Sequence, residues 1–375
     1  MGWTTKRWVS PGVRLGVALA LATLGCSDDH AAEVTVVAVD ALGPLESPAG
    51  IVGRDGGVSG RFRGRSVWVY GDSVTTEAGT YPNTWRNNTM SWTSDLDASD
   101  GLTDFVQPLD ADGAPREFFP RTEDEAAFNA EHLDHGDGTC DAPASDGEPC
   151  GARLAIWGSG PVEDVANGRA LLTYGKVHAA PGEFNFSILG TSLAVWNDFE
   201  SGPVRPLVDG TLDDPRLLFD ASEGEFAIPV AHAGDLYLFS CSGKGAAEHG
   251  CRLARAPLDH VLERAAWQFR GEGKWVDGAD QAARLFDGSP NMTVHFNAQV
   301  GRWLALYISW GKIQLRTAPA PEGPWSDELA LYEPPEQDAL HALSHAELSE
   351  QNGAVEYVSY LAENRFRLLR VELAP

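Results

Sequence analysis

Two aspartates, Asp55 and Asp72, bracket a predicted β-hairpin and are the residues of this chain best placed for chemistry. Between them, two runs of strand-forming residues flank Arg63-Gly64, a pair typical of a tight turn. If the turn lies there, position 55 is opposite position 72, and opposed residues have Cβ atoms about 4.5–5.5 Å apart. Carboxylates this close cannot comfortably ionise together, so one pKa rises, and such a split pair provides the acid and the base or nucleophile of glycoside hydrolysis. The alternative is two solvated turn acids in an acid-rich protein.

Residues 1–25 are predicted to be a signal peptide of the lipoprotein type. Three basic residues precede the apolar run 15–24, and Gly25-Cys26 follows, an order typical of an export signal rather than of a spanning helix. A small residue before a cysteine resembles a bacterial lipoprotein signal, although Thr23 stands where leucine is usual. We therefore expect an exported chain that begins at Cys26 and carries a lipid there. The alternative is ordinary cleavage and a soluble secreted protein.

The mature chain is strongly acidic. The whole sequence has a formal net charge of −26, and residues 1–25 hold three positive and no negative charges, so their removal gives −29. Such a chain repels nucleic acid and anionic membrane surfaces, and no later hydrophobic stretch is long enough to cross a bilayer. We expect no nucleic-acid partner, and membrane contact only through the lipid anchor at Cys26. An acid-lined cleft suits a neutral sugar or a developing cation, although part of the charge serves solubility alone.

Four cysteines remain in the mature chain and fall into two pairs with equal spacing. Cys140 is ten residues from Cys150, and Cys241 is ten residues from Cys251. The even count and the exported context favour two local disulfides, although four cysteines permit three pairings. The close double spacing of a zinc site is missing, and no histidine set completes one. The prediction is two disulfides, no metal and no cofactor.

The body of the chain repeats one unit five times. An apolar strand with aromatic residues recurs at 67–70, 171–174, 236–239, 303–307 and 357–360, each preceded by a turn and, before that, by another short strand. Hairpins at a loose long period predict an all-β, five-bladed β-propeller over residues 45–375, after a linker at 26–44. A β-sandwich is the rival fold. The first interval is the longest, and its excess at 95–150 predicts an acidic loop insertion near the first and second blades, over one face.

In a propeller the first strand of each blade lines the central channel, so the residues just before each aromatic strand are candidates for binding. Aromatic rings offer platforms for the apolar faces of a sugar, while amides and carboxylates bind its hydroxyls. Core packing is the alternative for Trp157, and a structural role with satisfied hydrogen bonds is the alternative for His345. Glu125, Glu225 and Glu347 are candidates for a third carboxylate. The predicted substrate-binding residues are Arg54, Trp157, Asn291, His345 and Glu347.

Several motifs together resemble one known family. They are Arg-Asp-Gly-Gly at 54–57, Trp-Val-Tyr-Gly-Asp-Ser at 68–73, Asn-Met-Thr-Val at 291–294, Gly-Pro-Trp-Ser at 323–326 and His-Ala-Glu-Leu at 345–348. In this order, over residues 45–373, they resemble domain-of-unknown-function family 4185, which includes bacterial endo-D-arabinanases, five-bladed propeller glycoside hydrolases. The resemblance implies a catalytic acid pair at Asp55 and Asp72. Ser73 stands where threonine is commoner in this family.

The residues and the resemblance together predict a glycoside hydrolase that acts on a polysaccharide. A furanoside such as arabinan, cleaved internally, is the expected substrate, and Asp55 and Asp72 are the expected catalytic acids. The first alternative is a noncatalytic carbohydrate-binding propeller lipoprotein on the cell surface. The second is a purely structural exported lipoprotein.

Overall fold

The structure is a computed structural model and describes residues 34–375 except 144, 211 and 242–249. The predicted signal peptide and Cys26 therefore lie outside the described residues. The described chain folds into five antiparallel sheets, which we call blades 1 to 5. Blade 1 contains β2 (Ile51–Phe62), β3 (Arg65–Thr75), β4 (Trp85–Arg86) and β5 (Thr89–Thr93). Blade 2 contains β6 (Arg153–Gly158), β7 (Val162–Asp164), β8 (Arg169–Ala179), β9 (Phe186–Trp196) and β10 (Phe219–Asp220).

The other three blades follow in chain order. Blade 3 contains β11 (Ile228–His232), β12 (Asp235–Ser240), β13 (Gly250–Pro257), β14 (Gln268–Arg270), β15 (Trp275–Val276) and β16 (Phe286–Asp287). Blade 4 contains β17 (Met292–Asn297), β18 (Arg302–Ser309), β19 (Lys312–Ala318) and β20 (Leu329–Tyr332). Blade 5 contains β21 (Leu340–Ser344), β22 (Val355–Ala362), β23 (Arg365–Ala374) and β1 (Thr35–Pro44).

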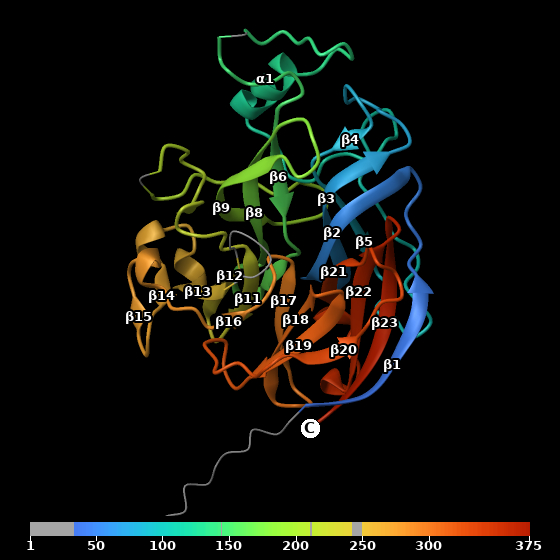
Figure 1. Cartoon of the computed structure of the whole chain (residues 1–375), viewed down its shortest axis with the longest axis vertical. Coiled ribbons are helices and arrows are strands. Elements are labelled where there is room, and N and C mark those ends of the chain that lie inside the picture. The colour runs from blue at the N-terminus through green and yellow to red at the C-terminus, as the bar shows by residue number, and fades with distance from the viewer. Residues whose placement is uncertain (1–33, 144, 211, 242–249) are drawn as a thin grey trace, which may run out of the picture. The chain divides into compact units, whose positions relative to one another are not determined.

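The inner strands of the blades form a closed ring; in blade 2 the inner position is shared by β6 and β7, which both pair with β8. Contacts run from β2 to β7, then to β11, β17 and β21, and from β21 back to β2. In Figure 1 the labelled inner strands β11, β17 and β21 lie near the centre of the five blades, whereas β1 and β15 lie at the outside. This arrangement confirms the predicted all-β, five-bladed propeller and excludes the sandwich.

The predicted aromatic strands are the second strands of the five blades. Each is almost fully buried along its aromatic segment, because neighbouring blades cover both of its faces. The apolar core is correspondingly divided into five clusters, each built from two neighbouring blades. A strand that is buried on both faces has no polar side, which explains the continuous apolar runs in the sequence.

The N-terminal strand β1 completes the last blade. It pairs with β23 along its whole length, from Thr35 opposite Ala374 to Pro44 opposite Arg367. Residues 35–44 fall within the segment predicted as a linker, and they form this strand instead of a free connection. The pairing joins the two ends of the described chain and covers the outer edge of β23, so that β1 is the outermost strand of blade 5.

Residues 95–150 connect blade 1 to blade 2. Those of them that the structure describes contain the helix α1 (Glu123–Glu131), which lies at the periphery beyond β6 in Figure 1, and otherwise only isolated bridges and turns. Thr122 caps the helix with a reciprocal capping box to Glu125. The interpretation of this segment as an insertion over one face stays a prediction. Short 3-10 turns complete the described elements: η1 (Val165–Asn167), η2 (Leu258–His260), η3 (Arg264–Ala266), η4 (Ala279–Gln281), η5 (Ala346–Leu348) and η6 (Gln351–Gly353).

Candidate functional site

The β2–β3 hairpin brings Asp55 close to Asp72. Phe62 pairs with Arg65 across the predicted two-residue turn. Two bulges follow, and they shift the pairing by one residue in opposite directions, so their effects cancel. Further along the hairpin Arg54 is therefore opposite Ser73, as in a hairpin without bulges. Asp55 consequently faces the 71–72 segment of β3, and its charge and that of Asp72 interact.

The bulges are built from glycines. Gly56 and Gly57 have φ angles of 81° and 84°, values that favour glycine over every other residue. A third glycine, Gly71, leaves room for the acid, since a Cβ atom there would lie 2.5 Å from Oδ1 of Asp55. The Asp-Gly-Gly motif and the Gly-Asp motif therefore shape one local site.

Three donors from other segments surround the carboxylate of Asp72. Trp157 and Trp85 direct their indole N–H groups to Oδ1, at 3.2 and 3.3 Å. Arg153 binds Oδ2 through Nη2 at 3.1 Å. All three interactions favour the ionised form of Asp72.

Burial raises the pKa of both carboxyl groups, but their polar partners differ. Burial, with the charge of Asp72 as the second cause, raises the pKa of Asp55 to about 7. Burial also raises the pKa of Asp72 above its usual value, but the Arg153 charge and the indole hydrogen bonds oppose this rise. Near neutral pH, Asp55 therefore holds a proton that it can donate, and Asp72 is the better candidate for the negative charge.

A cavity of about 470 Å³ opens beside this pair. It is lined by Trp157 and Phe186 from blade 2, Glu225 from the segment before β11, and Asn291 from the segment before β17. Trp157 connects the cavity to the pair, because its ring lines the cavity while its N–H binds Asp72. The ring of Phe186 contacts that of Trp157 edge to face, with centroids 4.9 Å apart.

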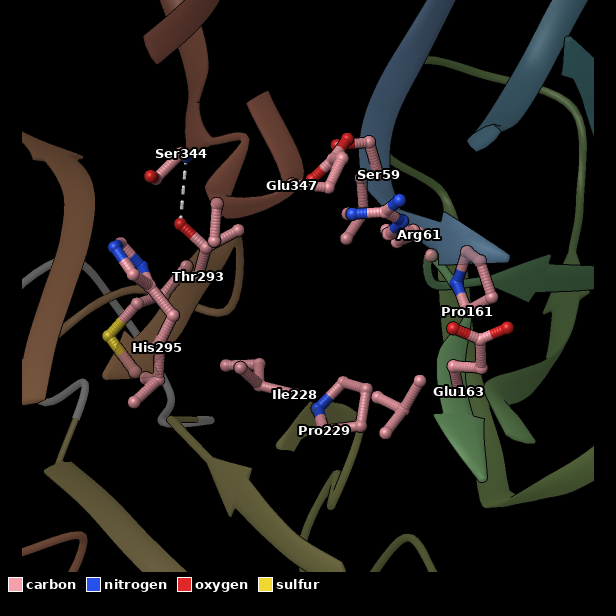
Figure 2. A pocket seen from close by; sticks show the side chains of 17 residues that line it. Ser59, Arg61, Pro161, Glu163, Ile228, Pro229, Thr293, His295, Ser344 and Glu347 are labelled. Atoms are coloured by element: carbon pink, nitrogen blue, oxygen red, sulfur yellow. Dashed lines mark hydrogen bonds between the residues drawn. The ribbon is translucent and has the colours of Figure 1, made fainter. Parts of the chain in front are cut away.

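A second cavity of about 330 Å³ lies further along the channel (Figure 2). Figure 2 shows side chains from all five blades around it, among them Ser59, Glu163, Thr293 and Glu347. Along blade 4, residues 290–292 line the first cavity and residues 292–295 line the second, so the second cavity is further along the chain direction of β17. In blade 3 the residues just before β11 likewise line only the first cavity. The inner strands thus run in one direction, from an end that we call the channel mouth. On β2, Val58 lines both cavities and the residues after it line only the second cavity. Asp55 comes before Val58 on this strand, so the Asp55–Asp72 pair lies toward the mouth.

The two cavities are separated by four mainly apolar residues that line both. These residues are Val58, Ile228, Pro229 and Met292. Glu347, predicted to bind substrate, is in the second cavity, where it accepts hydrogen bonds from Ser59 at 2.6 Å and Ser66 at 2.7 Å. Burial raises the pKa of Glu347 despite these donors.

Two predicted binding residues lie outside both cavities. Arg54 is buried with its guanidinium 3.5 Å from the centroid of the Tyr70 ring, and it donates to Gln107 at 3.2 Å. His345 has no exposed surface. Its Nδ1 lies 2.6 Å from the Ser59 hydroxyl, and its Nε2 lies 2.7 Å from that of Ser359. Burial lowers the pKa of His345 to about 3, so the ring is neutral. Its contact with Ser59 and the stacking of its ring on a buried tryptophan agree with the structural alternative.

The candidates for a third carboxylate have separate environments. Glu125 forms a buried ion pair with both terminal nitrogens of Arg205, at 2.6 and 2.9 Å, and with Lys176 at 3.3 Å. Burial would raise the pKa of Glu125, but the hydrogen bonds and charge of Arg205 outweigh it and hold the value at about 2. Glu125 therefore attaches α1 to blade 2, while Glu225 lines the mouth cavity and Glu347 the second cavity.

Both predicted disulfides are confirmed. Cys140 is bonded to Cys150 in the segment before blade 2, and Cys241 is bonded to Cys251 between β12 and β13. Within the part of the chain that the structure describes, no group of three or more His, Cys, Asp and Glu side chains is arranged to hold a metal ion.

Three residues of the mouth were not predicted as site residues from the sequence. Trp85, Arg153 and Phe186 have no motif, and they reach the site only through contacts between β3, β4, β6 and β9. Arg153 could have been considered because it begins the inner strand of blade 2. No comparable signal marks Trp85 or Phe186.

The fold and the mouth define a class of protein, a five-bladed propeller with two carboxyl groups across one hairpin at an end of its channel. The sequence profile of the family named Domain of unknown function (DUF4185) matches residues 211–361, which confirms the resemblance over that part of the chain. Asp55 and Asp72 lie before the matched residues. A comparison with curated proteins found no match.

Three solved structures are similar to this chain over most of its length. A provisionally named hydrolase from Bacteroides ovatus ATCC 8483 has 14% identity and a TM-score of 0.53, with 86% of each chain covered. Xylan β-1,4-xylosidase from Bacillus halodurans C-125 has 12% identity and a TM-score of 0.47, with 88% of this chain and 54% of that chain covered. The GH43_1 enzyme from Xanthomonas citri has 14% identity and a TM-score of 0.44, with 89% and 90% covered. At these identities the likeness concerns the fold alone.

Proposed function

We propose that this protein is a glycoside hydrolase in which Asp55 donates a proton to the leaving group and Asp72 acts as base or nucleophile. The observation that supports this proposal is that three donors surround the carboxylate of Asp72 while its buried neighbour Asp55 faces the charge of Asp72. The pKa of Asp55 is raised to about 7, whereas Arg153 and two indole N–H groups stabilise a charge on Asp72. Hydrolysis of a glycosidic bond needs one carboxylic acid and one carboxylate on either side of the scissile bond.

The proposed substrate is a polysaccharide, with arabinan as the first choice. The resemblance to a family that includes endo-D-arabinanases supports this choice. Trp157 and Asn291 would contact the sugar directly because both line the mouth cavity. Glu347 would act from the second cavity, while Arg54 and His345 are buried and would support the inner strands without touching the ligand.

The decisive experiment is replacement of each acid by its amide. Asp55→Asn and Asp72→Asn should each abolish cleavage of arabinans, fructans and other plant or bacterial glycans, as followed by product chromatography. Binding should remain, since neither change alters side-chain volume. The matched control is Asp112→Asn, which makes the same chemical change on an exposed turn.

The outcomes separate enzyme from binding module. Full activity of either amide variant would remove that residue from the mechanism. Measurable binding by a wild-type protein that cleaves no glycan would favour the noncatalytic carbohydrate-binding lipoprotein. If both amide variants unfold while the control remains folded, the acid pair is structural.

We also propose that the protein is exported and attached to a membrane by a lipid on Cys26. The two disulfides fit an oxidising compartment. No helix among residues 34–375, as far as they are described, is long and apolar enough to cross a membrane. Replacement of Cys26 by Ala should move the protein from the membrane fraction to the soluble exported fraction. An unchanged distribution, or a mature N-terminus after residue 26, would refute the lipid anchor.

A further inference from the structure

Two aromatic side chains are more exposed than every other large apolar side chain of the described residues. Phe184 is 88% exposed and Trp310 is 81% exposed. Phe184 lies in the connection between β8 and β9, and Trp310 lies in the two-residue turn between β18 and β19. Because both rings stay in contact with water, they contribute little hydrophobic stabilisation to the fold. Large exposed apolar groups often mark an interaction site.

Both residues also have unfavourable backbone conformations. The φ angle is 54° at Phe184 and 52° at Trp310, in the left-handed region where bulky side chains are rare. Trp310-Gly311 occupies a hairpin turn of the kind for which Asn-Gly is the preferred pair. An aromatic residue at these positions therefore contributes nothing to the turn itself.

The strand directions place both turns at the channel mouth. In blade 4, Met292 of the mouth cavity pairs with Tyr307, and β18 continues for two more residues before the turn at Trp310. In blade 2, Arg153 binds Asp72 and pairs with Ala179, which in turn pairs with Phe186. The connection that contains Phe184 therefore extends from the same end of blade 2.

The aromatic surface is continuous with the mouth cavity on the blade 2 side. Trp157 binds Asp72 and contacts Phe186, which is 46% exposed and only two residues from Phe184. Blade 4 contributes Asn291 to the cavity from the segment that leads into its inner strand. Phe184 and Trp310 thus stand on two blades that both contribute to the cavity.

We propose that Phe184 and Trp310, which we call the rim aromatics, are distal binding platforms for a neutral polysaccharide chain that crosses the channel mouth. The apolar faces of sugar rings stack on uncharged aromatic surfaces. The net charge of −26 disfavours a polyanionic chain. This inference rests on the proposed function for the identity of the bound polymer, and it specifies a long chain that is held on blades 2 and 4 and cleaved internally by the acid pair of blade 1.

Substitution by asparagine tests the proposal without disturbing the turns. Phe184→Asn and Trp310→Asn introduce a residue that accepts the left-handed conformation, so the melting temperature should stay the same or rise. Each change should weaken binding of the polysaccharide about five- to tenfold, and binding of a trisaccharide of the same sugar should change less than about twofold. The control is Val165→Ala, since Val165 is 79% exposed at the opposite end of blade 2 and its loss should change neither affinity.

The binding measurements use full-length protein that also carries Asp55→Asn, so that the polymers stay intact. The probes are arabinan, xylan, β-1,3-galactan and fructan in affinity electrophoresis, with calorimetry for the polymer that binds most tightly and for its trisaccharide. Unchanged polymer affinity in both asparagine variants would overturn the proposal even if the wild-type protein cleaves that polymer. Failure of the starting protein to bind any of the four polymers would overturn it as well.

The result is separable from the test of catalysis. A wild-type protein that cleaves nothing, but loses polymer binding in both rim variants, would support the platforms and refute the hydrolase. Light scattering addresses the other use of an exposed aromatic side chain, which is contact with a second copy of the protein. A change of oligomeric state in the rim variants with polymer binding unchanged would overturn the proposal.

Discussion

The carboxyl group of Asp55 occupies the space next to Gly71 that any side chain at position 71 would need. A Cβ atom on Gly71 would be 2.5 Å from Oδ1 of Asp55, and the short aspartate side chain has little freedom to move away. Gly71→Ala should therefore displace the acid and lower kcat about 100-fold, the typical cost of a misplacement of about 1 Å, with little loss of stability. Gly202→Ala is the control, because the nearest atom, the carbonyl oxygen of Phe118, would be 3.6 Å from the new methyl group. Wild-type kinetics in Gly71→Ala would show that the position of Asp55 is unimportant.

The dependence of cleavage on pH should report the acid pair. Activity requires Asp55 to be protonated and Asp72 to be ionised, so kcat/KM should fall above pH of about 7 as Asp55 loses its proton. On the acidic side, kcat/KM should fall as Asp72 gains a proton. This fall should occur at a higher pH than for an ordinary aspartate, because burial raises the pKa of Asp72. The two limbs belong to the pair as a whole, since the two charges interact. A profile that stays flat from pH 6 to 9 would contradict the role of Asp55.

Stability should show the same raised pKa with a defined sign. The unfolded chain releases the Asp55 proton near pH 3.8, whereas the folded protein retains it until about pH 7, so rising pH favours unfolding within this interval. The asparagine of Asp55→Asn cannot ionise, so the variant should gain unfolding free energy relative to the wild type as the pH rises from 4 to 7. Above pH 7 the difference in unfolding free energy between the two proteins should stay constant. A pKa that rises from 3.8 to about 7 corresponds to about 4 kcal/mol, so we expect a relative gain of roughly 4–8 °C in melting temperature. Scanning calorimetry from pH 4 to 8, with Asp112→Asn as reference, checks this; a constant difference across the range would refute it.

The two disulfides should differ in their contribution to stability. Cys241 and Cys251 are almost fully buried and join β12 to β13, whereas Cys140 and Cys150 are partly exposed in a segment outside the sheets. Replacement of the buried pair by alanine should cost about 3 kcal/mol of unfolding free energy, and replacement of the other pair should cost less. Urea unfolding measures both, and mass mapping of a nonreduced digest checks the pairing. Equal losses, or peptides that join the two pairs, would contradict this account.

Glu125 should matter for stability and not for the chemistry. Glu125→Gln removes the charge that pairs with the buried Arg205, and a broken buried ion pair typically costs about 3–5 kcal/mol. Since its folded pKa is held at about 2, the contribution of Glu125 is complete above about pH 4.5 and disappears as the pH falls toward 2. The exposed Glu123 of the same helix gives the control Glu123→Gln. Loss of kcat in correctly folded Glu125→Gln would return this residue to the list of catalytic candidates.

Local patterns were sufficient for the fold and for one part of the site. The turn at Arg63-Gly64 and the alternation of strand residues predicted that Asp55 meets Asp72, because a hairpin pairs residues that are close in sequence. The sequence did not predict that two bulges at Gly56 and Gly57 would shift the pairing in opposite directions. Because the two shifts cancel, the predicted register is preserved. The cysteine pairs followed from spacing for the same reason, since each closes a short loop.

The tertiary structure decided which groups surround these residues. Arg153 and Trp157 reach Asp72 from 81 and 85 positions away, through the packing of blade 2 against blade 1. The packing of blade 5 against blade 1 buries His345, and Arg54 is buried against Tyr70 and Gln107, although both residues adjoin residues of the channel in sequence. A pKa near 7 at Asp55 also depends on this packing, because it is caused mainly by the loss of solvent when the blades close into a ring. Short-range sequence patterns determine strands, turns and register, whereas burial and electrostatics are sums over neighbours that only the assembled propeller brings together.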